Sequence, residues 1–224
     1  MATRLSGGNT KFLPYNKGIE NPINSNGHKT AYLWEHILQP NNVLELIESF
    51  VHIRVETEKV YDAKLGKIKE KKSEILIFPR FHQLHVIQRL KETVVTEDVG
   101  HNYLIQHTTG SGKSLSIGWL AHLLTSLYRT TTDTKRMFDT IIVITDRRIL
   151  DRQIRQTIKQ LEQTPGVVNA VDKNSQQLKE FLEDGKSLII TTVQKFPVIS
   201  EEIAKLKSKS FGVIIDEVHS SQSG

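Results

Sequence analysis

The stretch YLIQHTTGSGKSLSIGWLAHLL, residues 103–124, indicates the fold most directly. Its first four residues predict a buried strand, its centre is rich in glycine, and a helical pattern opens at Lys113 or Ser114. Gly110 and Gly112 allow backbone N–H groups to approach phosphate oxygens without an intervening Cβ atom. The start of a helix adds unpaired N–H donors and the positive end of the helix dipole. The stretch therefore predicts a phosphate-binding loop between a strand and a helix.

The residue types in this loop suit a nucleoside triphosphate bound with a metal ion. Lys113 offers a mobile positive charge for the β- and γ-phosphates, and the hydroxyl of Ser114 can ligate Mg²⁺. The rest of the expected cradle consists of Thr109, Gly110, Ser111 and Gly112. His107 stands where the general pattern has a glycine, so the strict motif fails at its first position. The remaining motif and its context still favour ATP and Mg²⁺ as ligands.

A second element, FGVIIDEVH, covers residues 211–219. Its apolar residues predict an interior strand that ends at Asp216 and Glu217. In open α/β sheets, ligands bind at the carboxyl edge of the strands. We expect Asp216 to hold Mg²⁺ and Glu217 to act as the general base toward the attacking water. An acidic pair after a strand is often only a loop, and it is the upstream phosphate-binding loop that favours a nucleotide site here.

From residue 75 onward, short apolar strands alternate with helical patterns, which predicts an α/β fold with a parallel sheet and crossover helices. Strands are expected at 103–106, 141–145, 166–168, 188–192 and 213–216. Helices are expected at 113–129, 147–162, 174–183 and 194–206. Before this domain, residues 1–74 predict a lead-in, which has an irregular start, helices at 30–38 and 43–52, and a charged hairpin-like stretch.

Composition limits the class of protein. The 224 residues are 38% hydrophobic and 25% charged, which is ordinary for a globular protein. Cysteine is absent, which excludes disulfides and thiolate metal sites and fits a cytoplasmic location. No apolar run reaches the roughly 18 residues of a membrane span, so no membrane partner is expected. The net charge of +5 suits a polyanionic partner, although an ordinary solvated surface has a similar balance.

In combination, these motifs resemble those of superfamily 2 helicases and translocases. HTTGSGKS looks like motif I, and DEVH looks like motif II of that superfamily. The resemblance implies a RecA-like P-loop domain in which His219 couples the nucleotide to movement between domains. RFHQ, residues 80–83, is similar to the element whose glutamine reads the adenine edge, so the resemblance implies that Arg80 and Gln83 contact the base.

Two further stretches resemble the motifs with which this superfamily grips nucleic acid. VITDRRILDRQI (143–154) looks like motif Ia, and TTVQKF (191–196) looks like motif Ib. The resemblance implies DNA contacts by Arg147, Arg148 and Thr192. Arg152 and Arg155 follow Arg148 at helical spacing, where they can touch phosphates or form the solvated face of an amphipathic helix. The sequence leaves both interpretations open.

The match extends to the R (motor) subunit of type I restriction-modification enzymes. FPRFHQLHVIQRL, IIVITDRRILDRQI and IIDEVHSSQ look like segments of that subunit, as does the lead-in TRLSGGNTKFLPYNKG. The resemblance implies ATP-dependent translocation of double-stranded DNA by an enzyme that also contains modification (methyltransferase) and specificity subunits. Since the sequence ends shortly after Asp216, we expect a piece of such an enzyme, without the nuclease and second motor domains and with little turnover by itself.

Other interpretations remain open at this point. The chain can belong to another superfamily 2 helicase, such as a repair helicase or a chromatin-type remodeller, or it can be an inert remnant. Glu70-Lys71-Lys72, with Asp62 upstream, spells part of the nuclease signature of the type I enzymes. The surrounding charges predict a solvated surface segment instead.

Overall fold

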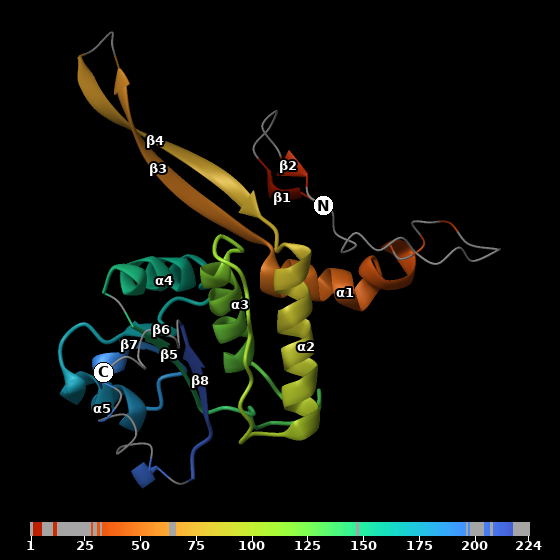
Figure 1. Cartoon of the computed structure of the whole chain (residues 1–224), viewed down its shortest axis with the longest axis vertical. Coiled ribbons are helices and arrows are strands. Elements are labelled where there is room, and N and C mark those ends of the chain that lie inside the picture. The colour runs from red at the N-terminus through yellow and green to blue at the C-terminus, as the bar shows by residue number, and fades with distance from the viewer. Residues whose placement is uncertain are drawn as a thin grey trace. The chain divides into compact units, whose positions relative to one another are not determined.

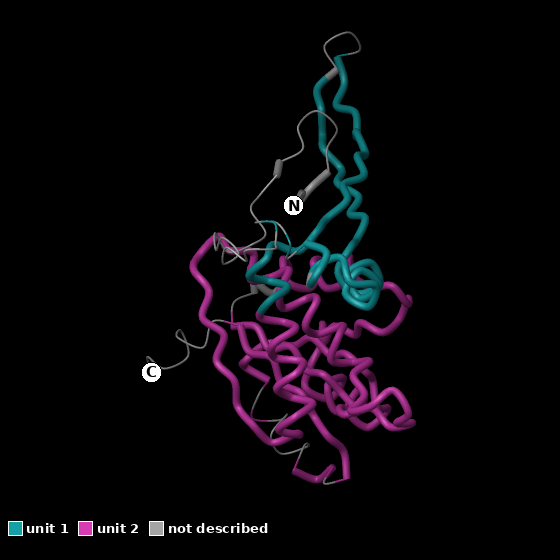
Figure 2. The backbone as a smooth tube through the Cα atoms, turned by 90° about the vertical axis from the view of Figure 1, so that its right-hand side faces the viewer, with its two compact units in different colours: residues 1–85 teal, residues 86–224 magenta. Residues whose placement is uncertain are grey.

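The chain forms two compact units, residues 1–85 and residues 86–224 (Figure 2). The computed structural model describes residues 2–5, 11–12, 28, 31, 33–62, 66–146, 148–195, 197, 204–206 and 208–216. The domain boundary expected from the sequence, between residues 74 and 75, stays a prediction.

The first unit contains an antiparallel sheet with the strand order β2-β1-β4-β3. Its strands are β1 (Ala2–Leu5), β2 (Lys11–Phe12), β3 (His52–Asp62) and β4 (Lys67–Ile77). The helices expected at 30–38 and 43–52 appear as three short segments, η1 (Leu33–Ile37), α1 (Pro40–Glu45) and η2 (Leu46–Phe50), of which η1 and η2 are π-helical. Pro40 lies in the first turn of α1. Proline is tolerated there because the N–H groups of a first helical turn have no partner within the helix, so the N–H that proline lacks is not needed.

The expected hairpin-like stretch is a two-stranded ribbon of β3 and β4 (Figure 1). Opposite charges face each other across it in the pairs Glu58–Lys71, Lys59–Glu70 and Asp62–Lys67. Glu70 opposes Lys59 and therefore shares its face of the ribbon. Asp62 lies three residues from Lys59, so it points to the opposite face, because side chains alternate along a strand. The charges that spell part of a nuclease signature therefore do not converge, although they lie in strands, which the sequence did not indicate.

The second unit contains a parallel sheet with the strand order β6-β7-β5-β8 (Figure 1). Its strands are β5 (Thr140–Thr145), β6 (Val168–Ala170), β7 (Leu188–Thr192) and β8 (Phe211–Ile215). Its helices are α3 (Lys113–Thr125), α4 (Arg148–Gln160), α5 (Ser175–Glu183) and the 3-10 turn η3 (Val193–Lys195). The α/β fold with crossover helices is therefore confirmed, as are the strands expected at 141–145, 188–192 and 213–216, whereas the strand expected at 166–168 begins only at Val168.

Both faces of this sheet are covered. Leu178 and Leu182 of α5 pack on Ile142, Ile144 and Ile189, which share one face because side chains alternate along each strand. Helices α3 and α4 contact the sheet as well. All six residues of β5 are buried, which explains why this strand reads as a continuous apolar and β-branched run in the sequence.

Helices α3 and α4 lie very close to each other. A Cβ atom added to Gly118 of α3 would stand 2.6 Å from Leu161 Cδ1, just beyond the end of α4. The His122 ring nitrogen Nε2 also hydrogen-bonds to the Ile158 carbonyl over 2.8 Å. Glycine at position 118 therefore permits the helix contact that holds α3 in place behind the phosphate-binding loop.

Two expectations about secondary structure are corrected or lie partly outside the described residues, and one helix was not expected. The strand expected at 103–106 is absent, because these residues pair with no described strand, and Leu104 is 81% exposed. Helix α2 (Phe81–Glu97) was not predicted, although its buried Leu84 and Ile87 follow helical spacing. The helix expected at 194–206 is described only at η3 and at a few residues beyond it.

The burial of the central strands predicts where this fold is sensitive. Ile190 of β7 is fully buried, whereas Ile215 of β8 is 48% exposed. Ile190→Ala is expected to lower the free energy of unfolding by about 2–5 kcal/mol, because it removes buried methyl groups and leaves a cavity. Ile215→Ala, a matched change in a neighbouring part of the sheet, is expected to cost far less. Urea unfolding followed by circular dichroism measures both, and equal losses would contradict this core.

Candidate nucleotide-binding site

The phosphate-binding loop has a backbone that only glycine adopts easily. Gly110 and Gly112 have φ angles of 79° and 88°, in the left-handed region. Gly112 is the N-cap residue of α3, and the Ser111 N–H donates to the Thr108 carbonyl over 3.2 Å, which tightens the turn. A Cβ atom added to Gly110 would meet nothing within 4 Å, so the loop is open on that side. Both glycines therefore adopt the left-handed conformation, and the phosphate contact expected of them stays a prediction.

The first turn of α3 directs backbone donors out of the helix. Its hydrogen bonds begin when Leu115 and Ser116 donate to the Gly112 carbonyl, over 3.1 and 3.2 Å. Within the described part of the chain, the N–H groups of Lys113 and Ser114 have no acceptor. Unpaired donors at the positive end of a helix dipole suit an anion such as a phosphate group. Both side chains are half-buried, at the place where the sequence predicts the β- and γ-phosphates.

Asp216 lies where the sheet ends. Its N–H donates to the Ile144 carbonyl over 3.0 Å, which extends the parallel ladder between β8 and β5 by one bond. Helix α3 contacts β8, and Figure 1 shows the start of α3 toward the edge to which β8 points. The loop and Asp216 therefore belong to the same edge of one unit. Glu217 and His219 lie outside the described residues.

The residues present fit Mg²⁺ in donor chemistry. Ser114 contributes a hydroxyl and Asp216 a carboxylate, both hard oxygen ligands of the kind that Mg²⁺ takes together with phosphate oxygens and water. Across the residues that the structure describes, no three histidine, aspartate or glutamate side chains gather into a metal site.

Gln83 and Arg80 belong to the first unit, at the start of α2. The Gln83 side-chain oxygen accepts a hydrogen bond from the Arg80 backbone N–H over 2.8 Å, and Gln83 is only 2% exposed. This contact satisfies a free donor at the helix start, as the glutamate or glutamine at position N3 of a capping box does. The adenine contact predicted for Gln83 and for the exposed Arg80 stays a prediction.

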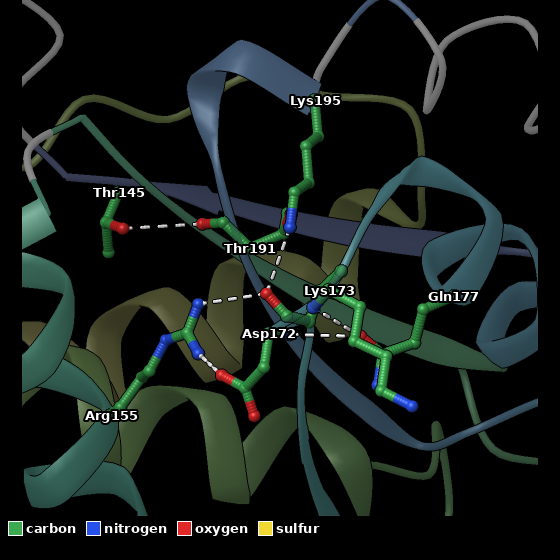
Figure 3. A network of polar contacts seen from close by, with 8 residues as sticks. Thr145, Arg155, Asp172, Lys173, Gln177, Thr191 and Lys195 are labelled. Atoms are coloured by element: carbon green, nitrogen blue, oxygen red, sulfur yellow. Dashed lines mark hydrogen bonds and ion pairs between the residues drawn. The ribbon is translucent and has the colours of Figure 1, made fainter.

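The residues predicted to contact DNA are described only in part. Thr192 ends β7 and is half-buried. Arg147 and the side chain of Arg148 lie outside the described residues, although Arg148 opens α4. Arg155 forms an ion pair with Asp172 and donates to the Val171 carbonyl over 3.2 Å (Figure 3). Arg155 is therefore tied to the loop after β6, and it is not simply part of a solvated helix face.

Several polar contacts order the segment between β6 and α5. The Gln177 side-chain oxygen accepts from the backbone N–H groups of Asp172 and Lys173, over 3.0 and 2.9 Å (Figure 3). The side chain of Asn174 caps α5 by accepting from the Gln177 N–H over 3.1 Å. Sequence reasoning missed the lysines that this segment brings near α4. The available signal was that residues 171–173 and 192–195 both follow predicted strands, whose carboxyl ends share an edge.

Comparison with known proteins agrees with this architecture. A family model described as SWI2/SNF2 ATPase matches residues 82–224. The chain belongs to this ATPase family. An ATPase domain with a loop of this geometry agrees with the superfamily 2 motifs and the RecA-like fold expected from the sequence. None of the described helices is long and apolar enough to cross a membrane.

Curated relatives of this chain are endonuclease subunits of type I restriction enzymes. The SsaAORF53P subunit of Staphylococcus saprophyticus is 29% identical over 154 residues, which cover 67% of this chain and 15% of that protein. The SauCOLORF180P subunit of Staphylococcus aureus shows the same identity and coverage. The HindI subunit of Haemophilus influenzae is 28% identical over 202 residues, or 84% of this chain and 17% of that protein. The resemblance to R subunits is confirmed, and the chain spans about a sixth of the length of such relatives.

Two glycines with left-handed backbones allow the effect of the loop on nucleotide binding to be separated from its effect on stability. Gly112→Ala places a side chain at φ 88°, and Gly166→Ala does the same at φ 90° in the loop before β6. Each change is expected to cost about 1–2 kcal/mol of stability from backbone strain. Only Gly112→Ala should also weaken Mg-ATP binding, because its strain displaces the loop donors. Urea unfolding and calorimetric titration measure the two effects, and unchanged ATP affinity in Gly112→Ala would contradict the loop assignment.

Proposed function

We propose that this chain is the ATP-binding part of an ATP-dependent double-stranded DNA translocase, the R subunit of a type I restriction endonuclease. The observation that carries the proposal is the loop with Gly110 and Gly112 in left-handed conformation, directly before the unpaired N–H donors of α3. The match to SWI2/SNF2 ATPases supports ATP as the nucleotide, and the curated relatives support the restriction enzyme. Modification and specificity subunits are the partners that this assignment implies.

Each residue at the site has a proposed role in nucleotide binding. The N–H groups at the start of α3 and the Lys113 ammonium hold the β- and γ-phosphates, which places the terminal phosphate beside the carboxyl end of β8. Ser114 and Asp216 hold Mg²⁺, which neutralises charge on the phosphate oxygens. Glu217 accepts a proton from the attacking water, and His219 couples the site to a second motor domain.

A second candidate function follows from the family description. The family model that matches more than half of this chain is described as a SWI2/SNF2 ATPase, a description that does not mention restriction. The chain would then be the motor of a different superfamily 2 translocase. Co-purification with type I modification and specificity subunits distinguishes the two candidates, because only a restriction enzyme needs those subunits.

The role of Lys113 is tested by calorimetric titration of Mg-ATP into the wild-type chain and into Lys113→Ala. A charge-assisted hydrogen bond contributes about 1.5–3 kcal/mol, so Lys113→Ala is expected to weaken binding roughly 10- to 150-fold. Lys135→Ala is the matched control, because Lys135 is exposed and lies in the same unit. Equal affinity of the wild type and Lys113→Ala would refute the nucleotide site.

Turnover gives a separate prediction. The resemblance places the charge that completes hydrolysis on a second motor domain, and such a charge is worth roughly 10³–10⁵ in rate in related phosphoryl-transfer enzymes. These 224 residues by themselves are therefore expected to bind ATP and hydrolyse it very slowly, with or without DNA. A phosphate-release assay measures the rate, and fast DNA-stimulated turnover would overturn this view.

A further inference from the structure

The outer part of the ribbon of β3 and β4 pairs with no other described strand. Strand β1 pairs with β4 only at Leu76 and Ile77, at the base of the ribbon, and β3 is the last strand of its sheet. The pairing of β3 with β4 nevertheless continues for eleven residue pairs, as far as Lys67. A two-stranded hairpin by itself is at best marginally stable in water. The outer pairs are therefore expected to need a surface that covers them.

One face of the ribbon is packed at its base, and the other face is open to solvent. Ile75 and Ile77, on the packed face, are 2% and 6% exposed. Ile53, Tyr61 and Ile68, on the open face, are 59%, 66% and 68% exposed. Apolar side chains that gather on an exposed surface mark an interaction site. The open face consists of Ile53, Val55, Thr57, Lys59 and Tyr61 of β3 and of Ile68, Glu70, Lys72, Glu74 and Leu76 of β4.

The open face is apolar at both ends and charged in its middle. Ile53 opposes Leu76 near the base of the ribbon, and Tyr61 opposes Ile68 near its tip. Between these apolar pairs lie two positive and two negative side chains, Lys59, Lys72, Glu70 and Glu74. None of the four forms an ion pair within the part of the chain that the structure describes. A face with no net charge and apolar ends suits a protein surface and does not favour a polyanion.

A second copy of this chain presents a complementary surface when two open faces meet and both ribbons point in the same direction. In that arrangement, β3 of each copy lies over β4 of the other, so each residue faces the type of residue that opposes it within its own ribbon. Lys59 then faces Glu70 of the second copy, and Glu70 faces Lys59 of the second copy. The apolar pairs at the two ends face each other in the same way and become buried.

The charges favour this direction over the opposite one. If the two ribbons overlapped fully but pointed in opposite directions, β3 would lie over β3 and β4 over β4. Lys72 would then face Lys72 of the second copy, and Glu74 would face Glu70. Like charges that face each other destabilise an interface. The arrangement with both ribbons in the same direction has no like-charged pair directly face to face.

We propose that the open face is the interface of a homodimer, in which two ribbons pack face to face and point in the same direction. Packed sheets lie about 10 Å apart, with their strands within about 30° of each other, so long charged side chains from the two copies can meet. Two strands of eleven residues form a narrow interface, so the dimer is expected to be weak and to depend on concentration. The inference does not depend on the proposed function.

Sedimentation velocity over a range of protein concentrations measures the dimer, and two charge reversals test its geometry. In Lys59→Glu and in Glu70→Lys, both facing pairs of the dimer become like-charged. Each variant alone is therefore expected to associate about tenfold more weakly than the wild type, or weaker still. An equimolar mixture of the two variants restores opposite charges at both facing pairs, so it is expected to dimerise about as well as the wild type. Each ribbon keeps its own altered pair in the mixture, so this recovery cannot come from a change in ribbon stability.

Glu58→Lys and Lys71→Glu are the matched controls, because they break the neighbouring cross-strand pair, which lies on the other face of the ribbon. Both controls are expected to associate like the wild type. If they weaken association as much as the open-face variants do, the effect comes from the ribbon in general and the proposed interface is wrong. A mixture that fails to recover would show that positions 59 and 70 do not face each other. A wild-type chain that stays monomeric at every concentration would also overturn the proposal and leave the open face to a different protein.

Discussion

The pairing of β5 with β7 on one side and β8 on the other is the constraint on which the second unit depends. All six residues of β5 are buried, and its parallel register aligns Thr145 with Thr192 and Ile144 with Ile215. The carboxyl ends of three strands are therefore brought to one edge, and whatever follows each strand meets there. Asp216 continues this ladder through its bond to Ile144, so its position depends on the sheet.

Two sets of hydrogen-bond donors in the second unit are positioned in different ways. The loop before α3 directs backbone N–H groups outward from a helix start, and its turn has glycine at the left-handed positions 110 and 112. Beside α4, the side chains of Arg155 and Lys195 are held by the Val171 carbonyl. The first arrangement depends on local backbone conformation, whereas the second depends on the sheet that brings these segments together.

Some features of the chain differ from what its local pattern indicates. Residues 103–106 have the apolar character of a strand, but strand structure requires a hydrogen-bonded neighbour, and they pair with no described strand. The hydroxyl of Tyr103 instead donates to Glu97 at the end of α2 over 2.9 Å. Partial burial, together with this hydrogen bond, raises the pKa of Tyr103 above its ordinary value. Gln83 likewise has a structural contact, in the cap of α2, beside the role that its motif suggests.

The sequence by itself determined the α/β class, the strands at 141–145 and 188–192, and the glycine loop before α3. These features rest on local patterns: apolar runs, glycine positions and helix spacing. Only the tertiary structure decided that Arg155 and Lys195 share one carbonyl and that Lys173 faces the same pocket as Arg152. These residues lie far apart in the chain, and their meeting depends on the order of the strands in the sheet. Strand order is set by packing over long sequence distances, which no local pattern encodes.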